Sequence, residues 1–423
     1  MLVAASVGFV ASTPAFADGL SLTATGTVLY DSNILRSLSS SGRSSDDVRY
    51  SPAGSAEYTR MLGFGTVGLT GLIGHDFFQN NSYLNRNRFG AGALLNTREG
   101  SRCSAGVNGN YTNRQNGIGS DNYRTGVPKT GTSTTPVSVD PTVPVTGDTL
   151  PDDVGRLIDN RQIFIVYGGH VSCGLPGGRA SFGGAAVRST LDNGSALRKF
   201  ANSSSTVYSL FAGVGVLRPG QLQVNGSFST IDYPNRLVLP GSTISPVGFN
   251  TGVKTYRGGL TYSRPIGTKL SGSIGLSYIR SVPDGGRAPF SAPAYDISLS
   301  YHPAPRLSFS ALGSRSVLSS SSAGALFRVV DTFQLTTNYD VSDTISARAN
   351  AGFISNNYQQ PFAIPGEPLR RSDTSKIAGA GVTYAPRSLY DLSLQLSETF
   401  RSSKPSIYDY NSTRVSLTLS VHV

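Results

Sequence analysis

Apolar and polar residues alternate along many short segments of this chain, which is the period of a β-strand with two different faces. Near residues 330–341, Phe333, Leu335 and Tyr339 fall on one face, while Gln334 and Asn338 fall on the other. Connections that are alternately short and long, and rich in Gly, Pro, Ser and Asn, join the segments. This combination is typical of a transmembrane β-barrel, in which one strand face contacts lipid and the other contacts water.

Alternation and turn residues together predict eighteen strands. We place them near residues 20–33, 47–60, 63–78, 83–98, 101–114, 161–174, 178–190, 204–218, 220–233, 253–264, 268–280, 292–302, 305–317, 330–341, 343–356, 372–385, 388–401 and 411–423. Short connections would be periplasmic turns and long ones extracellular loops, and an even strand number returns both ends to the periplasm. The predicted fold class is therefore all-β: a transmembrane antiparallel up-and-down β-barrel of about 18 strands with an open, water-filled lumen.

Composition argues against other fold classes. Only 38% of the 423 residues are hydrophobic, Trp is absent and 49 residues are Gly, so neither an ordinary soluble core nor an α-helical membrane protein is expected. Disorder is another interpretation of low hydrophobicity, but 20 Tyr and 19 Phe in regular alternation favour an ordered chain. A soluble propeller or repeat array would show a fixed repeat period, which the sequence lacks.

The first 17 residues are predominantly apolar and end in Ala15-Phe16-Ala17, the small-x-small pattern that signal peptidase cleaves. We predict a signal peptide over residues 1–17 and a single barrel domain over residues 18–423. No Lys or Arg precedes Arg36, so the usual basic start of a signal peptide is missing. A buried N-terminal strand or helix is the alternative.

The other end of the chain alternates from Arg414 to Val423. This segment resembles the C-terminal signal that the barrel-insertion machinery recognises in outer-membrane proteins, although Val423 stands where an aromatic residue is usual. We therefore expect that machinery to be a partner, and the bacterial outer membrane to be the location.

Two cysteines permit a geometric prediction. Cys103 opens the fifth predicted strand and Cys173 closes the sixth, so an antiparallel pair would bring both to the periplasmic end, on the apolar face. A disulfide is permitted outside the cytoplasm, and this one would close the longest loop, residues 115–160. Two unpaired buried thiols are the alternative.

Residues 115–160 would form the third extracellular loop, and they contain several aspartates: Asp121, Asp140, Asp148, Asp152, Asp153 and Asp159. In trimeric porins the third outer loop folds inward as an acidic constriction facing a basic wall. The position and charge of this loop are similar, but its composition fits a flexible surface loop equally well.

Side-chain parity also predicts the charge of the lumen. With the apolar parity outward, few acids face inward, among them Glu57 and Asp373. The inward arginines are Arg49, Arg86, Arg88, Arg98, Arg102, Arg114, Arg257, Arg348, Arg371 and Arg414. Guanidinium groups bind carboxylates and phosphates through a planar fork, so this set predicts a cationic wall. Contacts with lipopolysaccharide phosphates or solvent near the strand ends are the alternative.

Enzymatic and nucleic-acid functions are not expected. Metalloprotease and phosphate-loop motifs are absent and the four histidines are scattered, so we predict no catalysis, cofactor or metal. His75 and Asp76 lie near the outer rim, where we expect a solvated pair. Catalytic groups at the rim are the alternative, which the lack of other catalytic motifs disfavours. The net charge of +11 is spread around the ring, without a recognition helix for nucleic acid.

The segment Gly26-Thr27-Val28-Leu29-Tyr30-Asp31-Ser32-Asn33-Ile34-Leu35-Arg36 carries a family resemblance. Through Tyr30, Asp31, Asn33 and Arg36 it resembles the Tyr-Asp-x-Asn-(Ile/Leu)-x-Arg opening of EpsL-like outer-membrane β-barrel porins, which are associated with exopolysaccharide biosynthesis and export. The resemblance implies an eighteen-stranded conduit for a polysaccharide, docked on a periplasmic polysaccharide-export protein. Asp31 and Asn33 have a structural interpretation as well, because Asx residues commonly form turns at strand ends.

Three functions therefore stay open: an exopolysaccharide conduit, a general or anion-selective diffusion porin, and a structural or adhesive barrel with a plugged lumen. All three place the barrel in contact with outer-membrane lipid and lipopolysaccharide. A basic wall would favour an anionic polysaccharide.

Overall fold

The computed structural model describes residues 19–34, 46–97, 102–116, 160–174, 180–194, 199, 202–216, 220–235, 252–284, 288–319, 325–361, 371–387 and 389–422. The predicted signal peptide, Arg36, Arg98 and most of loop 115–160, with all six of its aspartates, lie outside these residues. Within the described part of the chain, no helix has the length and apolar character needed to span a membrane.

Eighteen strands form within the described residues, close to the predicted positions. They are β1 (Gly19–Asp31), β2 (Asp47–Leu62), β3 (Gly65–Phe78), β4 (Arg86–Thr97), β5 (Cys103–Asn116), β6 (Asn160–Gly174), β7 (Ala180–Asn193), β8 (Ser203–Gly215), β9 (Gln221–Asp232), β10 (Gly252–Ile266), β11 (Leu270–Pro283), β12 (Phe290–Ala304), β13 (Leu307–Ser319), β14 (Ala325–Asp340), β15 (Ile345–Pro361), β16 (Ser372–Arg387), β17 (Tyr390–Lys404) and β18 (Tyr410–His422). Two 3-10 turns, η1 (Ser82–Leu84) and η4 (Ser406–Tyr408), follow β3 and β17. The predicted strand ends differ from these by a few residues, because side chains beyond the membrane are under weaker pressure to alternate.

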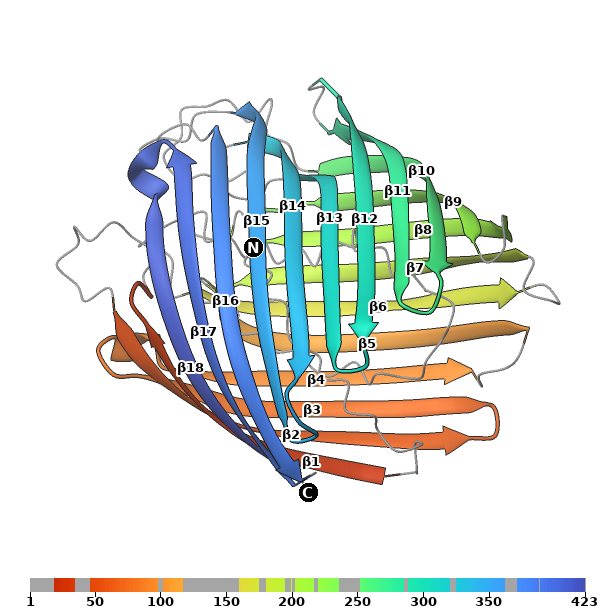
Figure 1. Ribbon diagram of the computed structural model, residues 1–423. Coiled ribbons are helices and arrows are strands. Elements are labelled where there is room, and N and C mark those ends of the chain that lie inside the picture. The colour runs from red at the N-terminus through yellow and green to blue at the C-terminus, as the bar shows by residue number, and fades with distance from the viewer. Residues whose placement is uncertain are drawn as a thin grey trace.

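The sheet closes into a barrel. Each strand pairs antiparallel with its sequence neighbours, and β1 also pairs with β18. In Figure 1 the strands β11–β18 run steeply down the front, while β2–β7 cross the view behind them, as tilted strands on opposite walls of a barrel do. Closure gives each described strand two partners. No strand edge is then left with unpaired backbone N–H and C=O groups, which would be costly in the hydrocarbon of the membrane. The predicted closed, eighteen-stranded antiparallel barrel is confirmed.

The two ends of the barrel have different connections. At one end, which we call the short-turn end, few residues join β2 to β3, β10 to β11 and β12 to β13. Gly267 in the β10–β11 turn has φ 66°, a left-handed conformation that suits glycine. At the other, long-loop end, longer connections follow β1, β5 and β9. β1 begins and β18 ends at the short-turn end, side by side at the bottom of Figure 1.

Side chains alternate between the two faces of the barrel, and the pairing register keeps one parity from strand to strand. Leu276 on β11 lies between Leu260 on β10 and Tyr295 on β12, in an outward row. The next residue, Ser277, belongs to an inward row. Leu276 is 63% exposed, which is unfavourable for leucine in water but suits a surface that lipid covers.

The interior is packed at the long-loop end and more open toward the short-turn end. On β17 the inward residues Thr399 and Arg401 are buried, whereas Gln395, nearer the short-turn end, is exposed. On β1 Asp31 is buried, whereas Ser21 is exposed. Two apolar clusters add to the packing: Ile34 with Phe78 and Leu84, and Val253 with Ile279, Ala294, Val317 and Phe327. The expected open lumen therefore corresponds to the short-turn part of the barrel.

Candidate functional site in the barrel lumen

The predicted lumen arginines fall into several groups. Six of them occupy inward positions on β2, β4, β10, β15 and β18: Arg49, Arg86, Arg88, Arg257, Arg348 and Arg414. Arg114 lies on β5, paired with Gln162 through the backbone. Arg102 and Arg371 lie just before β5 and β16 and are exposed. The lumen-lining role of these arginines stays a prediction.

Sequence reasoning missed two further inward arginines, Arg328 on β14 and Arg401 on β17. Arg328 precedes the predicted start of its strand, and Arg401 is the last residue of its predicted strand. Continuing the alternation by two residues would have identified Arg328, and applying it to the last residue of the predicted strand would have identified Arg401.

Four aspartates form ion pairs with inward arginines, which corrects the expectation of few inward acids. Near the seam, where β1 and β18 close the barrel, Asp373 Oδ2 lies 2.6 Å from Arg401 Nη2, and Asp31 Oδ2 lies 2.8 Å from Arg414 Nε. Asp76 Oδ1 lies 3.2 Å from Arg88 Nε. We call these three pairs, on β16–β18 and β1–β4, the ion-pair belt.

The ion-pair belt lies in the packed, long-loop part of the interior. The exposed fraction of each of its six side chains is 9% or less. Tyr358 adds a hydroxyl that donates to Asp373 Oδ2 over 2.7 Å, and Ser51 Oγ donates to Asp76 Oδ1 over 2.6 Å. Removing one partner of such a buried ion pair destabilises the protein, because the other charge stays buried without a compensating charge. The belt therefore joins strands and does not present free cations to a solute.

Asp31 and Asn33 of the family-like segment bridge the two ends of the chain. Asp31 Oδ1 accepts hydrogen bonds from Asn33 N (3.0 Å) and from Ser412 Oγ (2.8 Å), and Asp31 Oδ2 contacts Arg414. Asn33 Nδ2 donates to the carbonyl oxygen of Asn411 over 3.1 Å. The first of these contacts is an Asx turn, as the structural interpretation expects. The two residues thus fasten β1 to β18 at the closing seam.

The rest of that segment has structural roles where it is described. Tyr30 is on the outward face of β1, and Ile34 is buried against Phe78 and Leu84. Arg36 lies outside the described residues. Of the described residues in this segment, Tyr30 and Ile34 do not place a side chain on the open part of the lumen.

Hydroxyl groups line the opposite side of the lumen. We give the name hydroxyl wall to eight of the inward serines on β11–β13: Ser271, Ser273, Ser277, Ser298, Ser300, Ser308, Ser310 and Ser314. They are half-buried or exposed, and Ser273 Oγ lies 2.8 Å from Ser298 Oγ. Among described residues, inward charge on these three strands is confined to Asp296, which pairs with Arg257 of β10. The wall is therefore polar, accessible and close to neutral.

Amide and hydroxyl side chains extend this surface on both sides. Asn225 on β9 donates to Thr261 Oγ1 on β10 over 3.0 Å. Asn338 on β14 donates to Ser308 Oγ over 3.3 Å. Each of these groups can exchange its present partner for a hydroxyl of a solute.

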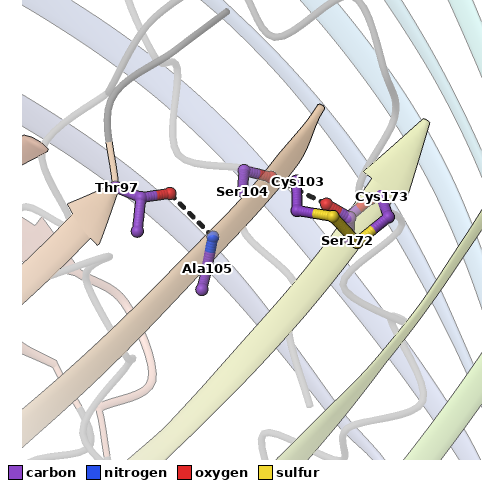
Figure 2. The surroundings of a disulfide bond; sticks show 6 residues. All are labelled: Thr97, Cys103, Ser104, Ala105, Ser172 and Cys173. Carbon is purple, nitrogen blue, oxygen red and sulfur yellow. Dashed lines mark hydrogen bonds between the residues drawn. A yellow bond between two sulfur atoms is a disulfide. The ribbon is translucent and has the colours of Figure 1, made fainter. Parts of the chain in front are cut away.

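The two cysteines meet as the register requires. Cys103 pairs directly with Cys173 on the outward face at the short-turn end, and their sulfurs form a disulfide with an S–S distance of 2.09 Å. Figure 2 shows the two sulfurs joined across the ends of β5 and β6. Beside them, Ala105 N donates to Thr97 Oγ1 over 2.8 Å, which ties β5 to the end of β4.

His75 and Asp76 do not form a pair. They follow each other on β3 and therefore point to opposite faces. His75 Nδ1 lies 2.6 Å from Asn87 Oδ1 on the outward face, whereas Asp76 is buried inside with Arg88. Neither the solvated pair nor a shared catalytic role fits this arrangement. Among the described residues, no group of three or more His, Cys, Asp or Glu side chains is placed to hold a metal ion.

Comparisons with known proteins found one family match and several similar solved structures. Residues 251–423, which span β10–β18, match the family described as "Putative beta-barrel porin 2". No curated protein sequence matches the chain. The outer membrane protein OpdK of Pseudomonas aeruginosa has a similar structure at 14% identity, covering 96% of this chain and 100% of its own, with a TM-score of 0.48.

Two other solved structures have comparable scores. OccK5 (OpdH) of Pseudomonas aeruginosa is 12% identical over 97% of this chain and 100% of its own, with a TM-score of 0.46. The siderophore receptor PirA of Acinetobacter baumannii is 6% identical over 97% of this chain and 81% of its own, with a TM-score of 0.48. The closed antiparallel barrel with an apolar outer face has the architecture of an outer-membrane β-barrel, and over residues 251–423 the chain is similar to a porin family.

Proposed function

We propose that this barrel is an outer-membrane conduit through which an exopolysaccharide leaves the cell, working with a periplasmic polysaccharide-export partner. One observation carries the proposal: the accessible part of the lumen is lined by hydroxyl and amide side chains and opens toward the short-turn end. In porins that end faces the periplasm, where an exported polymer would enter.

The wall chemistry suits a long sugar chain. A polymer that must keep moving needs many weak, interchangeable hydrogen bonds, because a few strong contacts would hold it in place. Serine hydroxyls donate and accept equally well and lie on a wall with little net charge. The resemblance of residues 26–36 to the opening of EpsL-like porins supports the same function.

A general diffusion porin is the second candidate. It is favoured by the match of residues 251–423 to a porin family and by Arg348, a half-buried inward residue on β15 that could attract small anions. Because four of the inward arginines are paired with aspartates, the lumen should be less selective for anions than the number of arginines alone implies.

Deletion of the gene, followed by complementation, tests the proposal. We expect loss of polysaccharide from the medium, restored by the wild-type chain but not by a variant whose lumen is obstructed through Ser273→Trp and Ser416→Trp. The matched control is Leu276→Trp, which places the same bulk on the lipid-facing side.

The other candidates predict different results. Normal secretion together with altered uptake of small anions would support the diffusion porin and reject the conduit. Normal secretion and normal uptake would favour a structural or adhesive barrel.

A further inference from the structure

We infer that the hydroxyl wall on β11–β13 is the surface along which the polymer moves, and that the polymer is uncharged. This inference rests on the proposed conduit function and names its substrate class.

The distribution of charge is the first reason. The ion-pair belt is buried in the long-loop part of the opposite side, so its arginines do not face the accessible lumen. On the accessible side, Arg257 is opposed by Asp296 and also donates from Nε to Ser277 Oγ over 2.9 Å. A path for a polyanion would instead need accessible cations repeated along its length. Among the described residues of β11–β13, the hydroxyl wall has no accessible Arg or Lys between the level of Arg257 and the short-turn end.

The geometry of the wall is the second reason. Neighbouring strands lie about 4.8 Å apart, and inward residues repeat about every 6.8 Å along a strand. Serines at these positions form a close grid of groups that donate and accept hydrogen bonds. A sugar unit that advances along this grid meets an equivalent partner for each one that it leaves. Contacts of similar strength at each step keep the barriers to sliding low.

The side chains between the serines keep the wall smooth. On β11 the inward row is interrupted by Gly275, which has no side chain to protrude. On β13 it contains Leu312, which is 48% exposed and could contact the apolar face of a sugar ring. Between the Asp296 level and the short-turn end, the described inward positions of β11–β13 include no Phe or Tyr ring on which a sugar would stack and pause, and their one aromatic ring is the imidazole of His302 at the end of β12.

Single-channel recording of the full chain in planar bilayers tests the inference. The probes are dextran, which is neutral, and polygalacturonate, which is anionic, in fragments of equal length added to both sides. We expect dextran to interrupt the ion current at concentrations about tenfold or more below those that polygalacturonate needs.

Variants locate the surface. The triple variant Ser273→Ala, Ser298→Ala, Ser310→Ala should shorten the dextran interruptions by about threefold or more, since a single lost hydrogen bond changes an equilibrium by about this factor. The control variant Thr25→Ala, Thr27→Ala, Ser416→Ala removes hydroxyls at half-buried inward positions of β1 and β18 and should leave the interruptions unchanged. If the triple variant does not fold, Ser298→Ala alone gives the same comparison with Ser416→Ala.

The outcomes are distinguishable. Stronger interruption by polygalacturonate would overturn the uncharged substrate while leaving the conduit function intact. Equal shortening by both variants would overturn the assignment to β11–β13. Free passage of potassium and chloride with no interruption by either polymer would overturn the conduit function itself.

Discussion

At the scale of single residues, Asp31 has the widest consequences. Its carboxylate contacts Arg414 and Ser412, which are 383 and 381 residues away in the sequence, so one side chain joins the two strands that close the barrel. The pair is almost fully buried, with exposed side-chain fractions of 1% for Asp31 and 9% for Arg414. Buried charges of this kind are costly to separate.

Replacing Asp31 by Asn should destabilise the barrel, because Arg414 would keep its charge and lose the opposite charge of Asp31. We expect a loss of about 3 kcal/mol in the free energy of unfolding, measured by urea titration in lipid vesicles. The control is Asp391→Asn at the short-turn end, whose partner His422 is 41% exposed, and which should cost less than about 1 kcal/mol. Equal effects of the two substitutions would argue against the seam pair as a stabilising contact.

The ion pairs also show what the sequence could predict about the lumen. Asp31, Asp76 and Asp296 have the inward parity of the arginines, so the alternation itself contained the signal that they share a face. Which acid meets which arginine depends on the register between strands, and the β1–β18 register joins segments that no local pattern connects. Parity is a local property, whereas pairing in the lumen is a property of the closed ring.

At the scale of elements, the strands were predictable because one short period decides both their conformation and their orientation. On β11, Leu276 must face lipid for Ser277 to face water, and a shift of one residue would exchange them. The turn positions followed from Gly and Pro for the same local reason. Long connections carry no such period, and Arg98 and the aspartates of loop 115–160 lie outside the described residues.

Two adjacent substitutions on β11 test this orientation. Leu276→Arg should reduce stability by about 2–4 kcal/mol, because it places a charge in the lipid-facing belt, whereas Ser277→Arg should fold normally. The measurement is the fraction of chain that migrates as a folded, heat-modifiable band after refolding into vesicles. If Ser277→Arg proved the more damaging, the assignment of faces would be reversed.

The disulfide is a feature of the β5–β6 pair. Reduction should increase the mass of the intact protein by about 2 Da. Cys173→Ser should lower the free energy of unfolding by about 2–4 kcal/mol, because the unfolded chain without the disulfide has more conformational entropy. Unfolding of the wild type with reductant should match that of the variant without it. An unchanged mass on reduction would show that the two thiols are not joined.

At the scale of the whole molecule, the barrel separates functions between its two sides. The ion-pair belt holds the seam side together at the long-loop end, and the hydroxyl wall lines the accessible lumen opposite. Ion selectivity should therefore follow the accessible arginines and depend little on the total number of inward arginines.

Charge reversal distinguishes these two groups. Arg348→Glu should shift the zero-current potential in a potassium chloride gradient toward cation selectivity, because this side chain is half-buried on the accessible part of β15. Arg88→Gln, at a buried arginine paired with Asp76, should change stability more than selectivity. Identical shifts for both variants would show that the buried arginine also senses passing ions.

The antiparallel contact between β1 and β18 also has a consequence for biogenesis. Thr23 on β1 and His422 on β18 are 399 residues apart in the sequence, so the contact that closes the barrel forms only after all the intervening strands have been made. During that interval an alternating, lipid-seeking chain is prone to self-association. We therefore expect that the chain needs holding chaperones in the periplasm until it reaches the membrane.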